Sequence, residues 1–418
     1  MRKFISRAAA LLLAGVMTAA VAGCGKNSDS EAKDTAKKWT ELDQTQITEA
    51  MGLGWNLGNQ LEASSGGLPS ETCWGNPEIT KELIDTVKAQ GFKTVRIPVS
   101  YLDYKIDTDW LDRVQEVVDY VVDNDMFAIV NMHGDGYYTV DHSWLLCAED
   151  DDKQTEIKDK YSKVWTQIAD RFKDYDQHLI FESMNEEFNN DYGKPDEKAY
   201  DNINAYNQIF VDSVRATGSN NEKRWLLLPG WNTNIEYTAG DDYNFKIPTD
   251  NGCKADGKRI MISVHYYDPF NFTIDENKTA KTQWGKYAVK NYDNWGQEDY
   301  VDSQMALLNE KFVSQGYPVV IGEFGAQDKT EKFADYNEFR RYWAEYLIKA
   351  AKKNGVVCVY WDNGYNGNKG FGIINRFDYT ITQPDLIAGM MRAINSTDDY
   401  EIPSPAGYTE VRKSAKAS

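Results

Sequence analysis

Basic residues, histidines and paired cysteine motifs are scarce in this sequence, and each shortage counts against a class of function. The 46 Lys and Arg face 65 Asp and Glu, which gives a net charge of −19. Nucleic acids and anionic membrane surfaces are bound through basic patches, so neither is expected as a partner. The chain has four His and no CxxC pair, so a structural zinc site is not expected. We predict no metal and no cofactor.

The longest apolar run, Ala8–Ala22, lies near the N-terminus and is too short for a comfortable membrane span. Arg2 and Lys3 precede it, and it leads into Gly23 and Cys24. This order resembles a bacterial lipoprotein signal, in which the Cys is lipidated. We therefore expect an exported protein that a lipid on Cys24 anchors to the bacterial cell surface. The alternative is an ordinary secretory signal, which would release a secreted protein.

Composition also divides the chain. Residues 1–23 are the predicted signal peptide, and residues 24–38, rich in Ser, Asp, Lys and Ala, are the predicted lipidated Cys and flexible tether. Residues 39–397 are predicted to form one domain, and residues 398–418 a polar tail. The remaining cysteines allow three disulfide pairings, which the sequence leaves open; they are Cys73, Cys147, Cys253 and Cys358. Cys358 lies in an apolar run and is expected to be a buried free thiol.

Apolar runs typical of buried strands recur along residues 39–397 and alternate with amphipathic segments. There are eight such runs: Met51–Asn59, Lys93–Ser100, Phe127–His133, Leu179–Glu186, Trp225–Trp231, Ile260–Tyr267, Pro318–Phe324 and Val356–Asp362. Near-continuous apolar strands separated by helices predict a parallel sheet covered on both faces. Eight of them predict an α/β fold of the (β/α)8 barrel type. A doubly wound open sheet is the alternative, but Gly52-x-Gly54 lacks the third Gly of a phosphate loop.

Polar and aromatic side chains collect where these runs end. In a parallel barrel the carboxyl ends of all strands meet at one face, where active sites are built. The residues expected there are Asn56, Asn59, Arg96, His133, Asn185, Glu186, Trp231, His265, Tyr267, Glu323 and Trp361. Two of the four His are among them. Such a gathering predicts a catalytic or binding face.

Glu186 and Glu323 are the pair best suited to chemistry. Two carboxyl groups that flank a glycosidic bond are what glycoside hydrolysis requires, one protonated and one ionised. Arg96 near Glu323 would keep that carboxyl ionised, because an adjacent cation favours the charged form. Glu186, beside an amide, would then be the proton donor. The alternative is that either Glu forms a structural ion pair at its strand end.

The sequence resembles glycoside hydrolase family 5, the retaining cellulases and mannanases. The motifs that carry the resemblance span nearly the whole mature chain: Gly54–Asn59, Val95–Val99, Asn131–His133, Phe181–Glu186, Val264–Phe270, Ile321–Gly325 and Tyr360–Asp362. The resemblance implies Glu186 as acid/base and Glu323 as nucleophile. It further implies that Arg96 steadies the nucleophile. The other positions that we assign to substrate binding and support are Asn56, His133, Asn185, Trp231, His265, Tyr267 and Trp361.

Two positions depart from the family pattern. Glu187 stands where the family usually has Pro, and either influences Glu186 or turns away into a salt bridge. Gly134 stands where a second His is often found, which affects fine specificity.

The chain is rich in aromatic residues, with 12 Trp and 26 Tyr, and sugar faces pack on such rings. Six Trp lie in or beside loops that follow strands, and two or three of them are expected to line a cleft: Trp55, Trp74, Trp144, Trp231, Trp284 and Trp295. We predict a monomeric enzyme that cleaves internal β-1,4 bonds of cellulose or a related β-glucan with retention. The alternatives are a β-mannanase, a xyloglucanase and a glycan-binding barrel without catalysis.

Overall fold

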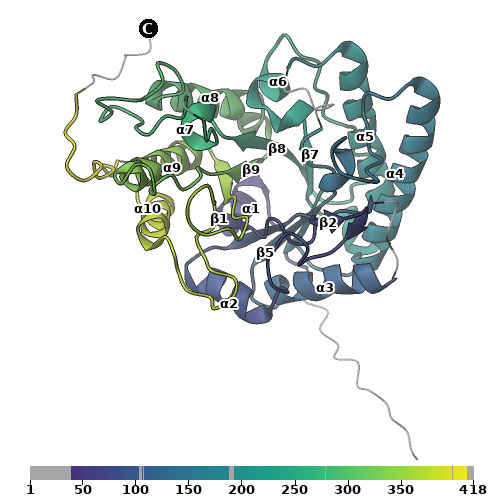
Figure 1. Cartoon of the computed structure of the whole chain (residues 1–418). Helices are drawn as coiled ribbons and strands as arrows, with labels where there is room; N and C mark the ends of the chain where they lie inside the picture. Colours follow the sequence, from purple (N-terminus) through teal and green to yellow (C-terminus); the bar gives the residue numbers. More distant parts are fainter. Residues whose placement is uncertain are drawn as a thin grey trace, which may run out of the picture. The chain divides into compact units, whose positions relative to one another are not determined.

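The strands close into a barrel around one interior. The computed structural model describes residues 39–102, 106, 108–187, 193–277, 279–397 and 399–411. Cys24, the predicted signal peptide and the predicted tether lie outside these residues. The barrel order is β1-β10-β9-β8-β7-β6-β5-β4, and every neighbouring pair is parallel (Figure 1). The predicted (β/α)8 barrel is therefore confirmed.

Each barrel strand is short and buried throughout. Their bounds are β1 Leu53–Asn56, β4 Thr94–Ile97, β5 Phe127–Asn131, β6 Leu179–Glu182, β7 Leu226–Pro229, β8 Ile260–Tyr266, β9 Val319–Phe324 and β10 Val356–Tyr360. All eight fall inside the predicted runs. Most runs extend past the strand at the C-terminal side, because their polar ends form the loops of the catalytic face.

Helices cover the outside of the barrel (Figure 1). They are α2 Lys81–Ala89, α3 Thr108–Val122, α4 Asp151–Arg171, α5 Glu197–Ala216, α6 Ile235–Ala239, α7 Phe270–Thr273, α8 Glu298–Lys311, α9 Tyr336–Lys353 and α10 Pro384–Asn395. Side chains cap several of their N-termini: Thr80 accepts from the Leu83 amide, and Asp150 accepts from the Lys153 amide. Such caps satisfy amides that the first helical turn leaves without partners.

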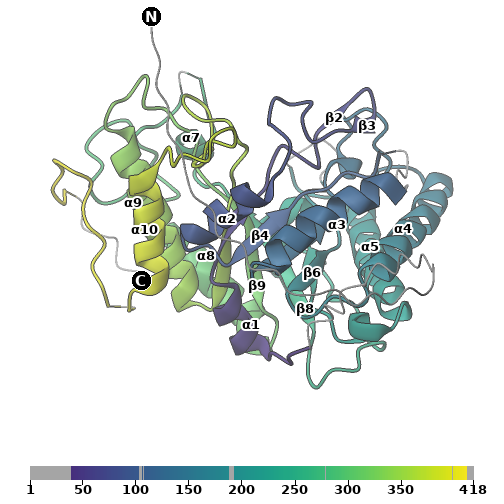
Figure 2. The same cartoon turned by 90° about the horizontal axis from the view of Figure 1, so that it is seen from below.

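One further helix, α1 (Gln44–Met51), closes the barrel at the N-terminal ends of the strands, whereas the short hairpin of β2 (Ser64–Ser65) and β3 (Leu68–Pro69) lies at the other end (Figure 2). A capping box between Asp43 and Gln46 starts α1. Ile47 and Met51 are fully buried and join the apolar interior cluster. The other members of this interior cluster are Phe127, Ile129, Ile180, Trp225, Leu227, Met261, Val320, Val357 and Val359.

Alternation along each strand explains why the barrel interior changes from apolar to polar. Successive strand side chains point to opposite faces. On β6, Ile180 belongs to the interior cluster and Phe181 to the outer core, so Glu182 points inward again. On β5 the same rule turns Asn131 inward after Ile129. A polar layer therefore lies above the apolar one, and it supports the catalytic face.

The structure adds two features that the sequence did not predict. The β2–β3 hairpin lies after β1, outside the eight runs predicted to be strands. Part of the predicted C-terminal tail packs on the domain: the Tyr408 ring packs edge-on against Phe339 of α9, and Arg341 donates to the carbonyls of Pro403 and Ser404. Sequence polarity missed this packing because one aromatic ring supplies much of it.

The cysteines Cys73, Cys147, Cys253 and Cys358 are all free, and Cys358 is buried as predicted. Within the described ranges, no helix combines the length and apolarity needed to cross a membrane.

Candidate active site

Arg96 on β4 is the centre of a buried polar network at the C-terminal end of the barrel. Its Nε lies 2.7 Å from Glu182 Oε2, and its Nη1 lies 2.8 Å from Glu323 Oε1. It also donates to the amide oxygens of Asn56 (3.0 Å) and Asn185 (2.8 Å). Burial by itself would lower the pKa of Arg96, but the carboxylates of Glu182 and Glu323 raise it above its ordinary value. The guanidinium therefore stays charged and orients four neighbours.

Glu323, at the end of β9, is held through both carboxyl oxygens. Oε1 accepts from Arg96, and Oε2 accepts from the Tyr267 hydroxyl at 2.9 Å. Burial, reinforced by the negative charges of Glu323 and Glu186, raises the pKa of Tyr267 well above its ordinary value, so this phenol remains a donor. Glu323 is thus held in a fixed orientation, with a guanidinium on one carboxyl oxygen and a phenol on the other.

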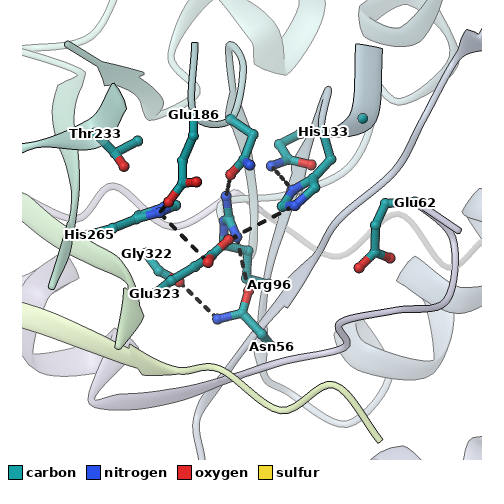
Figure 3. A network of polar contacts seen from close by, with 12 residues as sticks. Asn56, Glu62, Arg96, His133, Glu186, Thr233, His265, Gly322 and Glu323 are labelled. Carbon is teal, nitrogen blue, oxygen red and sulfur yellow. Dashed lines mark hydrogen bonds and ion pairs between the residues drawn. The ribbon is translucent and has the colours of Figure 1, made fainter. Parts of the chain in front are cut away.

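Glu186 follows β6 and is more exposed than Glu323, with 19% of its side chain accessible against 7%. Its Oε1 lies 2.7 Å from His265 Nδ1, which is also 3.7 Å from Glu323 Oε2. Figure 3 shows both carboxyl groups turned towards His265, and Glu323 turned also towards Arg96 and His133. One carboxyl oxygen of Glu186, one of Glu323 and one ring nitrogen of His265 all lie within 4.8 Å of one another. The two carboxyls therefore face one another across a gap small enough for a single anomeric carbon.

His133 and Trp361 form an aromatic wall beside these carboxyls. Their rings are parallel within 6°, with centroids 6.0 Å apart. Asn131 Nδ2 lies 3.1 Å from His133 Nδ1, which leaves Nε2 facing Glu323 Oε1 at 4.0 Å. Burial, then the positive charge of Arg96, lowers the pKa of His133 well below its ordinary value. His133 is therefore a neutral imidazole that can donate to a sugar hydroxyl.

The position of Trp361 is fixed from below. A Cβ on Gly58 would lie 2.7 Å from the Trp361 ring, so only glycine allows the indole to pack this closely. The next residue, Asp362, is fully buried and accepts from Trp55 Nε1 and from the Arg376 guanidinium. Arg376 also donates to the Gly58 carbonyl. It therefore links Gly58, which packs against the Trp361 indole, to Asp362, the residue that follows Trp361.

Several predicted substrate-binding residues lie elsewhere than at the surface of the site. Asn56 and Arg96 are fully buried, and Asn56 donates to the Gly322 carbonyl, so both position other groups instead of touching sugar. Trp231 is a correction: its ring is 2% exposed in the core, and its indole N–H donates to the Gly193 carbonyl. The loop after β7 turns this ring inward, which a strand-end position alone does not reveal.

The other Trp residues predicted to line a cleft divide into two groups. Trp74 and Trp295 are each 48% exposed, whereas Trp55, Trp144 and Trp284 are buried. Large apolar side chains favour burial, so an exposed indole on a loop is the informative exception. Trp74 and Trp295 are therefore the candidates for sugar contacts away from the carboxyls.

Sequence reasoning missed Glu182 and Tyr137. Glu182 is the buried counter-ion of Arg96 and also accepts from Asn131 and Ser263. A carboxylate inside the apolar run Leu179–Glu182 was the available signal, because a buried charge needs a partner. Tyr137 donates to Glu186 Oε2 at 3.3 Å and accepts from Asn185 Nδ2 at 2.6 Å. No strand pattern marks it, since it lies six residues beyond β5.

Glu187 turns away from Glu186 and forms no ion pair among the described residues. It is 1% exposed, and its carboxyl lies against Gly136, where a Cβ would come within 1.7 Å of Oε1. Burial, reinforced by the charge of Asp135, raises the pKa of Glu187 well above its ordinary value. Burial likewise raises the pKa of Asp135 to about 7. The departure from Pro thus places a neutral carboxyl under the loop that follows β5.

Glu186, His265 and Glu323 also form a group that is close enough to hold a metal ion. The charged guanidinium of Arg96, 2.8 Å from Glu323 Oε1, disfavours a second cation there. The two carboxyls are better explained as a catalytic pair, and the absence of a metal stays a prediction.

Two carboxyl groups this close, at the C-terminal face of an α/β barrel, are the arrangement expected of a glycosidase. Residues 58–367 match the family model "Cellulase (glycosyl hydrolase family 5)". Endoglucanase A of Paenibacillus barcinonensis is 50% identical over 399 residues, which cover 92% of this chain and 97% of that protein.

Solved structures agree with this family. A family 5 xyloglucanase from Paenibacillus pabuli has 52% identity and a TM-score of 0.81, over 84% of this chain and 100% of that one. A broad specificity endoglucanase from Bacteroides salanitronis has 38% identity and a TM-score of 0.79, over 86% and 97% of the two chains. The chain belongs to glycosyl hydrolase family 5 and is a glycoside hydrolase, so the alternative of a barrel without catalysis is set aside.

We expect the neutral carboxyl of Glu187 to make stability depend on pH. The folded-state pKa of Glu187 lies well above its ordinary value of 4.5. Its contribution to the free energy of unfolding is therefore complete below about pH 4.5 and is lost as the pH rises through the folded-state pKa. Thermal unfolding of the wild type should therefore show a falling Tm from pH 5 to pH 8. Glu187→Gln should make this fall shallower, because the amide cannot ionise and only the part due to other buried carboxyls such as Asp135 remains.

The matched control is Glu331→Gln, which changes an exposed carboxyl and should leave the wild-type slope. An equally steep fall of Tm in Glu187→Gln would contradict the assignment of a protonated Glu187.

Proposed function

We propose that this glycoside hydrolase cleaves internal β-1,4-glucosidic bonds of β-glucans by double displacement with retention of configuration. The observation that carries the mechanism is the gap between Glu186 and Glu323, whose nearest donor atoms lie within 4.8 Å. Retaining enzymes hold their carboxyls about 5–5.5 Å apart, whereas inverting enzymes need about 6.5–9.5 Å to admit a water.

In the first step Glu323 attacks the anomeric carbon and forms a covalent glycosyl-enzyme. Arg96 and Tyr267 keep its carboxylate ionised and aimed. Glu186 gives its proton to the glycosidic oxygen as the carbon–oxygen bond breaks, and the leaving chain departs with a free hydroxyl. Glu186 suits this task because it is the more exposed of the two carboxyls and receives no guanidinium contact among the described residues.

In the second step a water attacks the anomeric carbon and Glu186, now ionised, takes the water's proton. The bond to Glu323 breaks, and the sugar leaves with its original configuration. The configuration is retained because the anomeric carbon is attacked twice, each time from the side opposite the group that leaves. His133 and Trp361 supply the wall on which the sugar at the cleavage point rests.

The names of the relatives support a glucan backbone as substrate. One is an endoglucanase, one a broad specificity endoglucanase and one a xyloglucanase. Xyloglucan has the same β-1,4-glucan backbone with side chains, so we propose it as the second substrate. A preference for β-mannan is our third alternative.

Glu323→Gln should lower turnover of a β-glucan by about 10⁴-fold, because it removes the covalent nucleophile while keeping its shape. Binding of a cello-oligosaccharide, measured by calorimetry, should persist. In the wild type, proton NMR should show the β-anomer of the new reducing end first. Initial appearance of the α-anomer, or an active Glu323→Gln, would contradict the mechanism.

A substrate panel tests specificity. Carboxymethylcellulose, barley mixed-linkage glucan and xyloglucan should be hydrolysed, and their viscosity should fall faster than reducing ends accumulate, because internal bonds are cut. Mannan is the comparison, and activity on mannan alone would refute a glucan substrate.

We also propose that the enzyme is anchored to the membrane through a lipid on Cys24, as the run Val21–Cys24 suggests. Cys24→Ser, expressed with its signal in a bacterium, should move β-glucanase activity from the membrane fraction to the soluble fraction. An unchanged membrane fraction would favour another form of attachment.

A further inference from the structure

Glu186 contacts a second side chain besides His265, the hydroxyl of Tyr137, which lies on a different loop. His265 Nδ1 contacts Oε1 at 2.7 Å, and the Tyr137 hydroxyl contacts Oε2 at 3.3 Å. The two contacts come from the two sides of β6, His265 from β8 and Tyr137 from the loop after β5. Each carboxyl oxygen of Glu186, the proposed proton donor, is therefore contacted by a different side chain.

The direction of the Tyr137 hydrogen bond follows from Asn185. The Asn185 side-chain oxygen accepts from Arg96 at 2.8 Å, which fixes the amide with its nitrogen towards Tyr137. That nitrogen donates to the Tyr137 oxygen at 2.6 Å. The phenolic hydrogen is then directed to Glu186 Oε2, so the chain Arg96–Asn185–Tyr137–Glu186 runs in one direction.

The loop that carries Tyr137 is locked in place. The short 3₁₀ turn Gly134–Gly136 is fixed at its start by Ser100, whose hydroxyl accepts from the Gly134 amide at 3.0 Å. In its middle, the buried carboxyl of Asp135 accepts from the Tyr101 amide and from Trp144 Nε1. At its end, Gly136 rests on the Glu187 carboxyl. Since Glu187 is the next residue after Glu186, this contact fixes the position of the turn relative to the proposed proton donor.

We propose that Tyr137 is a positioning residue for the proton-donating step, acting on Glu186 Oε2. The proposal rests on the function proposed above and deepens it. When Glu186 is protonated on Oε2, the contact with Tyr137 is weak. As the proton passes to the glycosidic oxygen, the bond from carbon to that oxygen breaks, the bond to Glu323 forms, and negative charge appears on Oε2.

Tyr137 then donates to an anion, and hydrogen bonds to ions are stronger than neutral ones. The interaction is therefore better in the transition state than in the ground state, which is the condition for a gain in rate. It also follows that the benefit exists only where the leaving group needs a proton.

The test compares two substrates in Tyr137→Phe. A cello-oligosaccharide has a poor leaving group and needs the acid, whereas 2,4-dinitrophenyl β-cellobioside has a leaving group that departs without a proton. We expect kcat/KM for the oligosaccharide to fall by about tenfold. For the dinitrophenyl glycoside we expect it to stay within about twofold of the wild type. The basic limb of the pH–rate profile should move to higher pH, because the ionised form of Glu186 has lost a donor.

The matched control is Tyr138→Phe, the same change at the next residue, which is exposed. It should leave both substrates and the pH profile unchanged. Thermal unfolding of Tyr137→Phe checks that the fold persists.

Equal losses on both substrates would overturn the proposal, because Tyr137 would then only order the loop. No loss on either substrate would overturn it as well. Failure of the proposed function looks different: the wild type would then hydrolyse neither substrate or would give the inverted product.

Discussion

A single buried positive charge, the guanidinium of Arg96, is the constraint on which the site depends. It is fully buried and contacts Glu182, Glu323, Asn56 and Asn185. Removing one partner of a buried ion pair costs about 3–5 kcal/mol, because the remaining charge is left in a medium that cannot solvate it. The barrel therefore tolerates Arg96 only with both carboxylates in place, and this requirement fixes the nucleophile before substrate arrives.

The two carboxyl groups differ because their surroundings differ. Glu323 receives a guanidinium and a phenol, whereas Glu186 receives an imidazole and a phenol and is more exposed. These different surroundings suit the two roles that we propose, nucleophile for Glu323 and proton carrier for Glu186. Asn131 and Ser263 donate to Glu182 in the barrel interior, and Glu182 in turn fixes the position of Arg96. This polar layer therefore keeps the guanidinium beside Glu323.

The loops after β1, β5 and β10 add a second level of order. Gly58 lets the Trp361 indole pack closely, and Arg376 ties the carbonyls of Gly58 and Asp362 together. Under the loop after β5, buried neutral Glu187 takes the place that Pro usually has in the family. The acid/base residue is thereby joined to the loop that carries Tyr137, a connection that a Pro could not make because it has no polar side chain.

The sequence by itself predicted the barrel, and it predicted that Glu186 and Glu323 would meet at one face, where the structure brings them together. Eight apolar runs of strand length, alternating with amphipathic helices, admit few other architectures, and polar residues at the C-terminal ends of parallel strands must converge. Only the tertiary structure decided which side chains from different strands and loops contact one another. Glu182 and Arg96 are 86 residues apart, Trp231 turns into the core, and Tyr137 reaches Glu186 from another loop. Such contacts depend on loop conformation and side-chain direction, which a strand pattern does not encode.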